Sequence, residues 1–160
     1  MTPKKAAAIT DSPAGETQLC VSLVFPIEPL PASRPRVTKW GTYIAKPYKG
    51  WLAEAAKYLK TVNAVVPEGP LVVVVEVVCT KARTSKLVTP KGDIDNYLKA
   101  PLDAITHAKL WEDDKWVTTV IASKRFAATG EAAHTSVRIY ATAQQTVFAR
   151  ACEFIGSLFR

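Results

Sequence analysis

The stretch Leu71-Val-Val-Val-Val-Glu-Val-Val-Cys79 is the longest apolar run in this 160-residue chain, and it indicates the centre of the fold. β-Branched residues favour extended backbone, and a strand that is apolar at nearly every position suits a sheet covered on both faces. Glu76 interrupts the run, which is also far shorter than the roughly 20 apolar residues needed to cross a bilayer. We therefore predict a buried central strand over 71–79.

The segments on either side of this strand show the periodicities of further strands and helices. Apolar residues alternate in 19–25, and extended patterns recur in 116–126 and 134–142. Helical spacing of apolar residues appears in 48–62 and, roughly, in 95–109. The order β-α-β-α-β-β, followed by an amphipathic C-terminal helix, predicts an α+β fold with helices packed on a mixed β-sheet. We expect a flexible tail over 1–17, one folded domain over 18–142 and the C-terminal helix over 143–160.

Proline marks two irregular places in this pattern. Four prolines lie between residues 26 and 35 and predict an extended loop, which continues through basic and aromatic residues to Lys46. Pro101 lies within the second predicted helix. Because proline lacks a backbone donor, that helix either kinks at Pro101 or begins late, with Pro101 in its first turn.

Composition and charge narrow the class of protein. Apolar residues make up 48% and charged residues 22%, which is typical of a folded globular domain. The net charge of +7 favours a polyanionic partner such as nucleic acid, although a merely basic surface would give the same number. No secretory signal, disulfide framework or GxSxG, HExxH, Walker A or GxGxxG motif is found, and we expect a cytoplasmic protein.

Acidic residues are concentrated in one short part of this basic chain. Two carboxylates two positions apart project to the same side of an extended segment, where a divalent cation would offset their repulsion. Mg²⁺ prefers one or two carboxylates with water and phosphate oxygens, and a third carboxylate could come from residue 113 or 114. Helix capping and a solvated turn would use the same residues. The six acids between positions 93 and 114 are Asp93, Asp95, Asp103, Glu112, Asp113 and Asp114.

Cations border this acidic cluster on both sides. Lys99 follows Asp95 by four residues and so shares its helix face, either as a surface ion pair or as a charge that holds a scissile phosphate. The segment 81–91, which we call the basic loop, contains four cations and no acid. It would deliver a polyanion to a metal site, although a solvated loop would look the same.

The combination of these motifs resembles one family. The run Asp93-Ile-Asp-Asn-Tyr-Leu-Lys99, then Asp103-Ala-Ile105 and Leu110-Trp-Glu-Asp-Asp114, is similar to the signature of the RusA family of Holliday junction resolvases. The likeness is nearly ungapped over 93–114 and extends more loosely to 34–37 and 48–51. Lys109 and Pro101 depart from the family pattern, at positions that bear on helix geometry.

This resemblance implies a homodimeric endodeoxyribonuclease that uses Mg²⁺, or Mn²⁺ in its place, to cut four-way DNA junctions symmetrically in recombination and repair. It implies that Asp93, Asp95 and Asp114 are the catalytic metal carboxylates and that Lys99 is the catalytic lysine. The positions that match the signature in a supporting role are Asn96, Asp103 and Asp113. The basic residues expected to contact DNA phosphates are Arg34, Arg36, Lys81, Arg83, Lys86 and Lys91.

Two other functions remain open from the sequence. A less selective nuclease that trims flaps or forks would need the same carboxylates and lysine. A non-catalytic junction-binding module would need the basic surface but would have no use for carboxylates that face phosphates.

Overall fold

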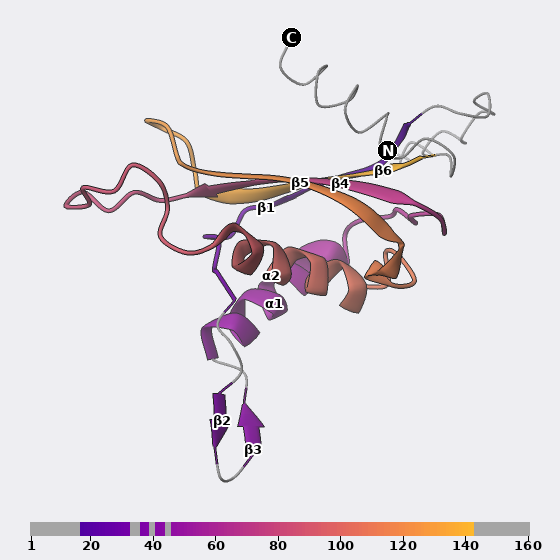
Figure 1. The fold of residues 1–160 in the computed structure, drawn as a ribbon, viewed down its shortest axis with the longest axis horizontal. Coiled ribbons are helices and arrows are strands. Elements are labelled where there is room, and N and C mark those ends of the chain that lie inside the picture. The colour runs from indigo at the N-terminus through magenta and orange to yellow at the C-terminus, as the bar shows by residue number, and fades with distance from the viewer. Residues whose placement is uncertain (1–16, 33–35, 39–40, 44–45, 143–160) are drawn as a thin grey trace, which may run out of the picture.

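The computed structural model describes residues 17–32, 36–38, 41–43 and 46–142 (Figure 1). The expected C-terminal helix, and all but the last residue of the expected tail, lie outside these residues. The elements are β1 (Gln18–Phe25), β2 (Arg36–Thr38), β3 (Gly41–Tyr43), α1 (Lys46–Leu59), β4 (Leu71–Cys79), α2 (Ile94–His107), a 3₁₀ turn (Asp114–Trp116), β5 (Val117–Phe126) and β6 (His134–Ala141). The predicted α+β class is confirmed.

Four strands form one mixed sheet in the order β1-β6-β4-β5. β6 pairs antiparallel with both β1 and β4, whereas β4 and β5 are parallel. Parallel neighbours need a long crossover, and α2 lies within the connection between these two strands. Every residue of β4 except Glu76 is buried, which confirms the predicted central strand.

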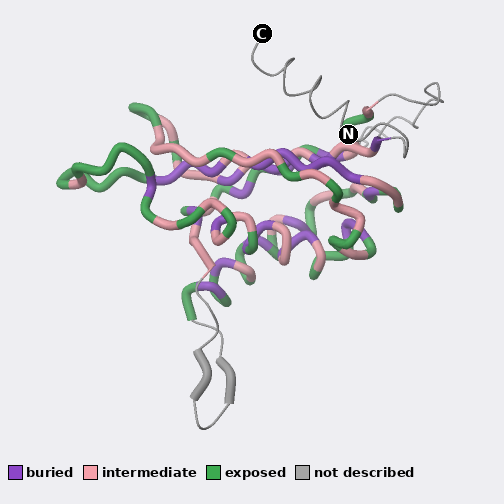
Figure 2. The backbone as a smooth tube through the Cα atoms, in the orientation of Figure 1, coloured by how far each residue is buried: buried purple, intermediate pink, exposed green. Residues whose placement is uncertain are grey.

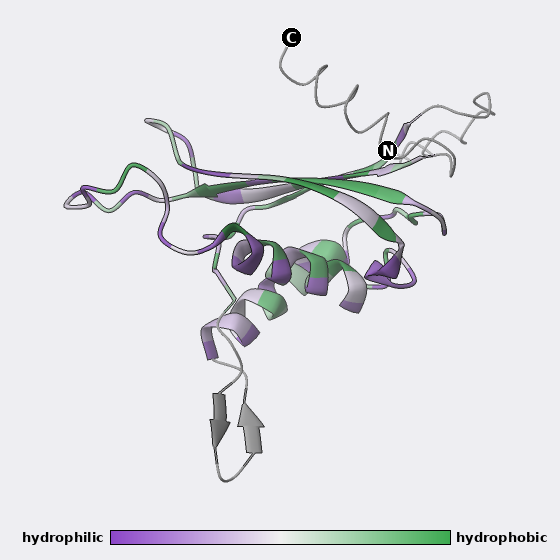
Figure 3. Ribbon diagram, in the orientation of Figure 1, coloured by the Kyte–Doolittle hydropathy of each residue, from purple (hydrophilic) through white to green (hydrophobic). Residues whose placement is uncertain are grey.

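Both helices cover the same face of this sheet (Figure 1). The core between the layers includes Leu23 and Phe25 of β1, Ala55 of α1, Ile105 of α2 and Ile139 of β6, all fully buried. Apolar residues follow the strands, whereas hydrophilic residues line the outer sides of both helices (Figure 3). Burying one large aliphatic or aromatic side chain contributes about 1.5–3 kcal/mol, so this layer holds the helices in fixed positions on the sheet.

The structure differs from the sequence prediction at two places. The segment expected to remain a loop up to Lys46 contains a short antiparallel pair, β2 and β3. The run of prolines ends at residue 35, so nothing prevents the following residues from pairing across the turn. α2 begins at Ile94 and is continuous through the buried Pro101, so the alternative of a late start is wrong.

Candidate active site

The start of α2 is shaped by a turn that only glycine adopts easily. Gly92 has a φ of 115°, and a Cβ at this position would lie 3.3 Å from both Pro31 and Tyr97. The next residue, Asp93, is extended and forms the N-cap, and Asp95 lies in the first helical turn. The backbone N–H of Ala32 also donates to the Asn96 carbonyl oxygen over 2.7 Å. The proline-rich loop is thereby fixed against the start of α2.

The two carboxylates at this helix start are free to bind a ligand. Asp93 and Asp95 are exposed, and the Asp93 side chain makes no capping hydrogen bond, so the structure does not support the capping alternative for this residue. Within the described residues neither carboxylate accepts a hydrogen bond or forms an ion pair. Unengaged carboxylate oxygens beside a helix N-terminus are a donor set that fits a hard cation such as Mg²⁺.

Lys99 lies one turn further along α2 and is fixed by a neighbouring residue. Its Nζ is 3.7 Å from Oδ2 of Asp103, and the lysine side chain is 59% exposed. The same oxygen accepts a 2.6 Å hydrogen bond from the hydroxyl group of Tyr48 on α1. Burial, together with this hydrogen bond, raises the pKa of Tyr48 well above its usual value. The phenol therefore stays protonated and holds the carboxylate that faces Lys99.

The structure does not bring Asp114 to the other two aspartates within the chain. Asp114 follows the end of α2 and begins the 3₁₀ turn, on the opposite side of the molecule from the start of α2 (Figure 1). The 14 residues of α2 span about 21 Å at roughly 1.5 Å per residue. Accordingly, no three acidic, histidine or cysteine side chains in the described part of the chain lie close enough to hold a metal ion.

The residues next to Asp114 form an ordinary turn. Asp113 is the N-cap of the 3₁₀ turn, and its carboxylate accepts a 2.7 Å hydrogen bond from the backbone N–H of Lys115. The indole N–H of Trp116 donates to Glu112. For Asp113 and Glu112 the turn interpretation of the acidic cluster is therefore correct, whereas Asp114 itself stays exposed.

One cation close to the site was missed by the sequence analysis. Lys124 lies on β5 opposite Val77 of β4, and its ammonium group donates a hydrogen bond to the carbonyl oxygen of Gly92. It therefore supports the turn that presents Asp93. The sequence offers one signal for this role of Lys124: the residues two positions before and after it, Ala122 and Phe126, are apolar.

The basic loop begins and ends at residues fixed by the body of the protein. At its start, the carboxylate of Glu28 accepts hydrogen bonds of 2.9 and 2.6 Å from the backbone N–H and the hydroxyl group of Thr80. At its end, the Tyr97 hydroxyl group donates to the Lys91 carbonyl oxygen over 2.8 Å. Its four cations are exposed beside the start of α2: Lys81, Arg83, Lys86 and Lys91. Arg34 lies outside the described residues, and of Arg36 only its place at the start of β2 is described.

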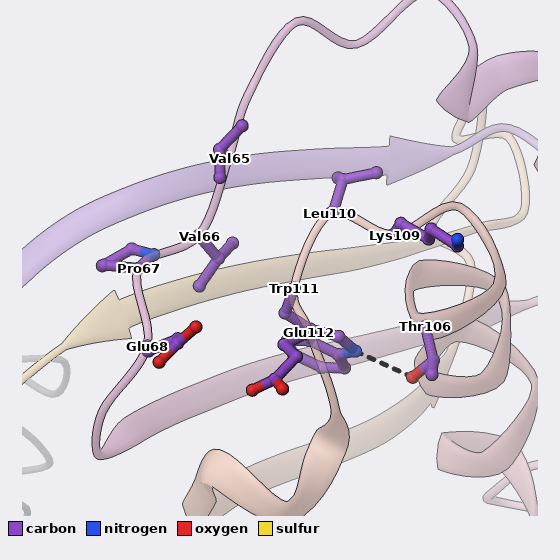
Figure 4. Close-up of a pocket in the computed structure, with 9 residues that line it drawn as sticks. All are labelled: Val65, Val66, Pro67, Glu68, Thr106, Lys109, Leu110, Trp111 and Glu112. Carbon is purple, nitrogen blue, oxygen red and sulfur yellow. Dashed lines mark hydrogen bonds between the residues drawn. The ribbon is translucent and has the colours of Figure 1, made fainter.

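A cavity of about 550 Å³ lies away from this group, at the end of α2 (Figure 4). Trp111 lines it and donates a 2.7 Å hydrogen bond to the Thr106 hydroxyl group. Its charged lining residues are Glu68, Glu112 and Lys109. It is therefore not a continuation of the basic surface around Asp93.

A carboxylate pair without partners among the described residues, a lysine one turn away and a basic loop together have the chemistry that an enzyme acting on nucleic acid phosphates would need. A family model described as Endodeoxyribonuclease RusA matches residues 26–140. The chain belongs to this family and is an endodeoxyribonuclease. No curated protein matches the chain. Within the described ranges, no helix has the length and apolar character needed to span a membrane.

Proposed function

We propose that this endodeoxyribonuclease is a Mg²⁺-dependent resolvase that cuts four-way DNA junctions symmetrically, as a homodimer, during recombination and repair. The observation that supports this function best is the pair Asp93 and Asp95, which has no partner among the described residues, with Lys99 one turn away and the basic loop nearby. A structural helix cap would not need two free carboxylates next to a surface suited to phosphates.

Each group has a definite task in this proposal. Asp93 and Asp95 would hold Mg²⁺, which would acidify a water molecule and polarise the scissile phosphate. Lys99 lies beside the phosphate and stabilises the negative charge that develops during hydrolysis. Asp103 and Tyr48 orient Lys99, and Lys124 keeps the Gly92 turn in place. Asn96 and Asp113 act as supporting residues in the helix start and in the turn.

The distance along α2 determines how Asp114 could take part. Ligand oxygens lie about 2.0–2.1 Å from Mg²⁺, so two carboxylates on one ion cannot be separated by the length of a 14-residue helix. We therefore place Asp114 of one protomer in the site of its partner. In a twofold dimer this exchange occurs twice, which gives two equivalent sites for the opposing strands of a junction.

A cleavage assay tests this function against the two alternatives. The substrates are a labelled immobile four-way junction, a flap and a linear duplex, each with Mg²⁺, Mn²⁺ or EDTA. We expect paired nicks at symmetric positions in the junction alone, abolished by EDTA. Equal cutting of the flap would favour the less selective nuclease. Tight junction binding without any cutting in either metal would favour the binding module.

A further inference from the structure

The basic loop turns at Arg83 and Thr84, and the limb that returns from this turn towards α2 carries two exposed apolar residues. Val88 is 90% exposed and Leu87 is 49% exposed. The loop extends beyond the end of the sheet, on the same side of the molecule as the start of α2, and most of it is exposed (Figures 1 and 2). Neighbouring apolar residues that stay exposed on a projecting loop are candidates for an interaction site.

The surroundings of Leu87 and Val88 favour a polyanion as the partner. No acidic residue occurs between Glu76 and Asp93, and the four exposed cations of the basic loop flank the two residues on both sides. A protein partner that needed only an apolar contact would not require this unbalanced positive charge. Val65 offers a comparison, because it is 82% exposed but lies next to Glu68.

The loop has a defined conformation, which keeps Leu87 and Val88 in place. Besides the anchors at Thr80 and Lys91, the backbone N–H of Ser85 donates to the Ala82 carbonyl oxygen over 2.9 Å, and Pro90 is buried. Leu87 is half-exposed and lines a cavity of about 230 Å³ against the body of the protein. This pair of residues therefore does not have to fold when it meets its target.

We infer that Leu87 and Val88 form a wedge that inserts between the unstacked bases at the branch point of DNA. Apolar side chains that enter base steps and unstack them are a recognised mode of binding, and unstacking costs least where pairing is already interrupted. The cations of the basic loop hold the phosphates on either side. This inference deepens the proposed function, because it names the feature of branched DNA that the enzyme recognises.

A fluorescence experiment tests the wedge without DNA cleavage. An Asp95→Asn protein is titrated into a four-way junction that carries 2-aminopurine at the crossover, whose fluorescence rises when it is unstacked. The same background then receives Leu87→Ser with Val88→Ser. Val65→Ser serves as the matched control for Val88, since this side chain is about equally exposed but lines the cavity at the other end of α2. Val88→Leu retains an apolar side chain at position 88. Duplex binding and thermal melting are measured for every variant.

We expect the fluorescence to rise with the Asp95→Asn protein and with the Val65→Ser and Val88→Leu variants. The double serine variant should lose most of this rise and about tenfold in junction affinity, with duplex affinity and melting temperature unchanged. Junction preference that persists with an unaltered fluorescence rise in the double variant would refute the wedge alone. Equal affinity of the Asp95→Asn protein for junction and duplex would overturn both the proposed function and this inference.

Discussion

A heterodimer with a different substitution in each protomer tests the origin of Asp114 in the active site. One chain carries Asp95→Asn and its partner carries Asp114→Asn, with two affinity tags to purify the mixed species. Each substitution alone removes a ligand from both sites of a homodimer, so both homodimers should be inactive. If Asp114 crosses to the partner, both substitutions in the heterodimer affect the same site, and the other site remains complete.

The expected nicking rate of the heterodimer follows from the length of α2 together with the symmetry of the dimer. About 21 Å of helix separates its two ends, whereas oxygens that share one Mg²⁺ lie no more than about 4 Å apart. Asp95 lies in the first turn of α2 and Asp114 lies beyond its last residue, and no three acidic side chains of the described residues lie close enough to hold a metal ion. One of two symmetric sites is then intact, and we expect about half the nicking rate of the unsubstituted dimer.

The assay uses a supercoiled plasmid with an extruded cruciform, because it separates single from paired cuts. The unsubstituted dimer should yield linear product, and the heterodimer should yield nicked circles that do not become linear. An inactive heterodimer would refute exchange of Asp114 between protomers, provided that it still binds the junction. Activity in the Asp114→Asn homodimer would show that this carboxylate is not a ligand at all.

Four further outcomes follow from individual contacts. Asp95→Ala should lower single-turnover cleavage at least about 100-fold, while gel-shift affinity for the junction stays equal or rises because a negative charge is removed. Tyr48→Phe removes the hydrogen bond to Asp103 and should lower the free energy of unfolding by about 1.5 kcal/mol, or the melting temperature by about 3–6 °C in a thermal scan; an unchanged melting temperature would contradict this contact. Hydrogen bonds from Arg125 lower the pKa of Glu131 from 4.5 to about 2. The stability that Glu131 provides is therefore complete above pH 4.5 and is lost as the pH falls towards 2. Over this range the melting temperature of the unsubstituted protein should converge with that of Glu131→Gln. Neutralising one cation of the basic loop should reduce the slope of log junction affinity against log salt by about 0.9, and an unchanged slope would place that cation away from the phosphates.

The strands and the helix start were predictable because their signals are local. The alternation in 19–25 and the apolar run in 71–79 report directly on which faces are buried, and β1 and β4 were found there. Asp93 and Asp95 are two residues apart, so any helix that begins at this point keeps them together.

Contacts between distant residues could not be predicted in this way. Glu28 meets Thr80 across 52 positions, and Lys124 meets Gly92 across 32, because the sheet topology brings them together. The prediction that Asp114 completes the site stands untested, but helix length already separates it from Asp95 within one chain. The β2–β3 pair was missed because its two strands have only three residues each, too few for a periodic pattern.

The position of β6 in the sheet has a consequence for how the protein is made. β6 is the last strand of the described residues, yet it lies between β1 and β4 and pairs with both. On the ribosome, β1 therefore has no neighbour until nearly the whole domain has emerged, and an N-terminal fragment would expose two open strand edges. The sheet of this nuclease should accordingly form only after β6 has been synthesised, and a chain truncated before residue 134 should aggregate.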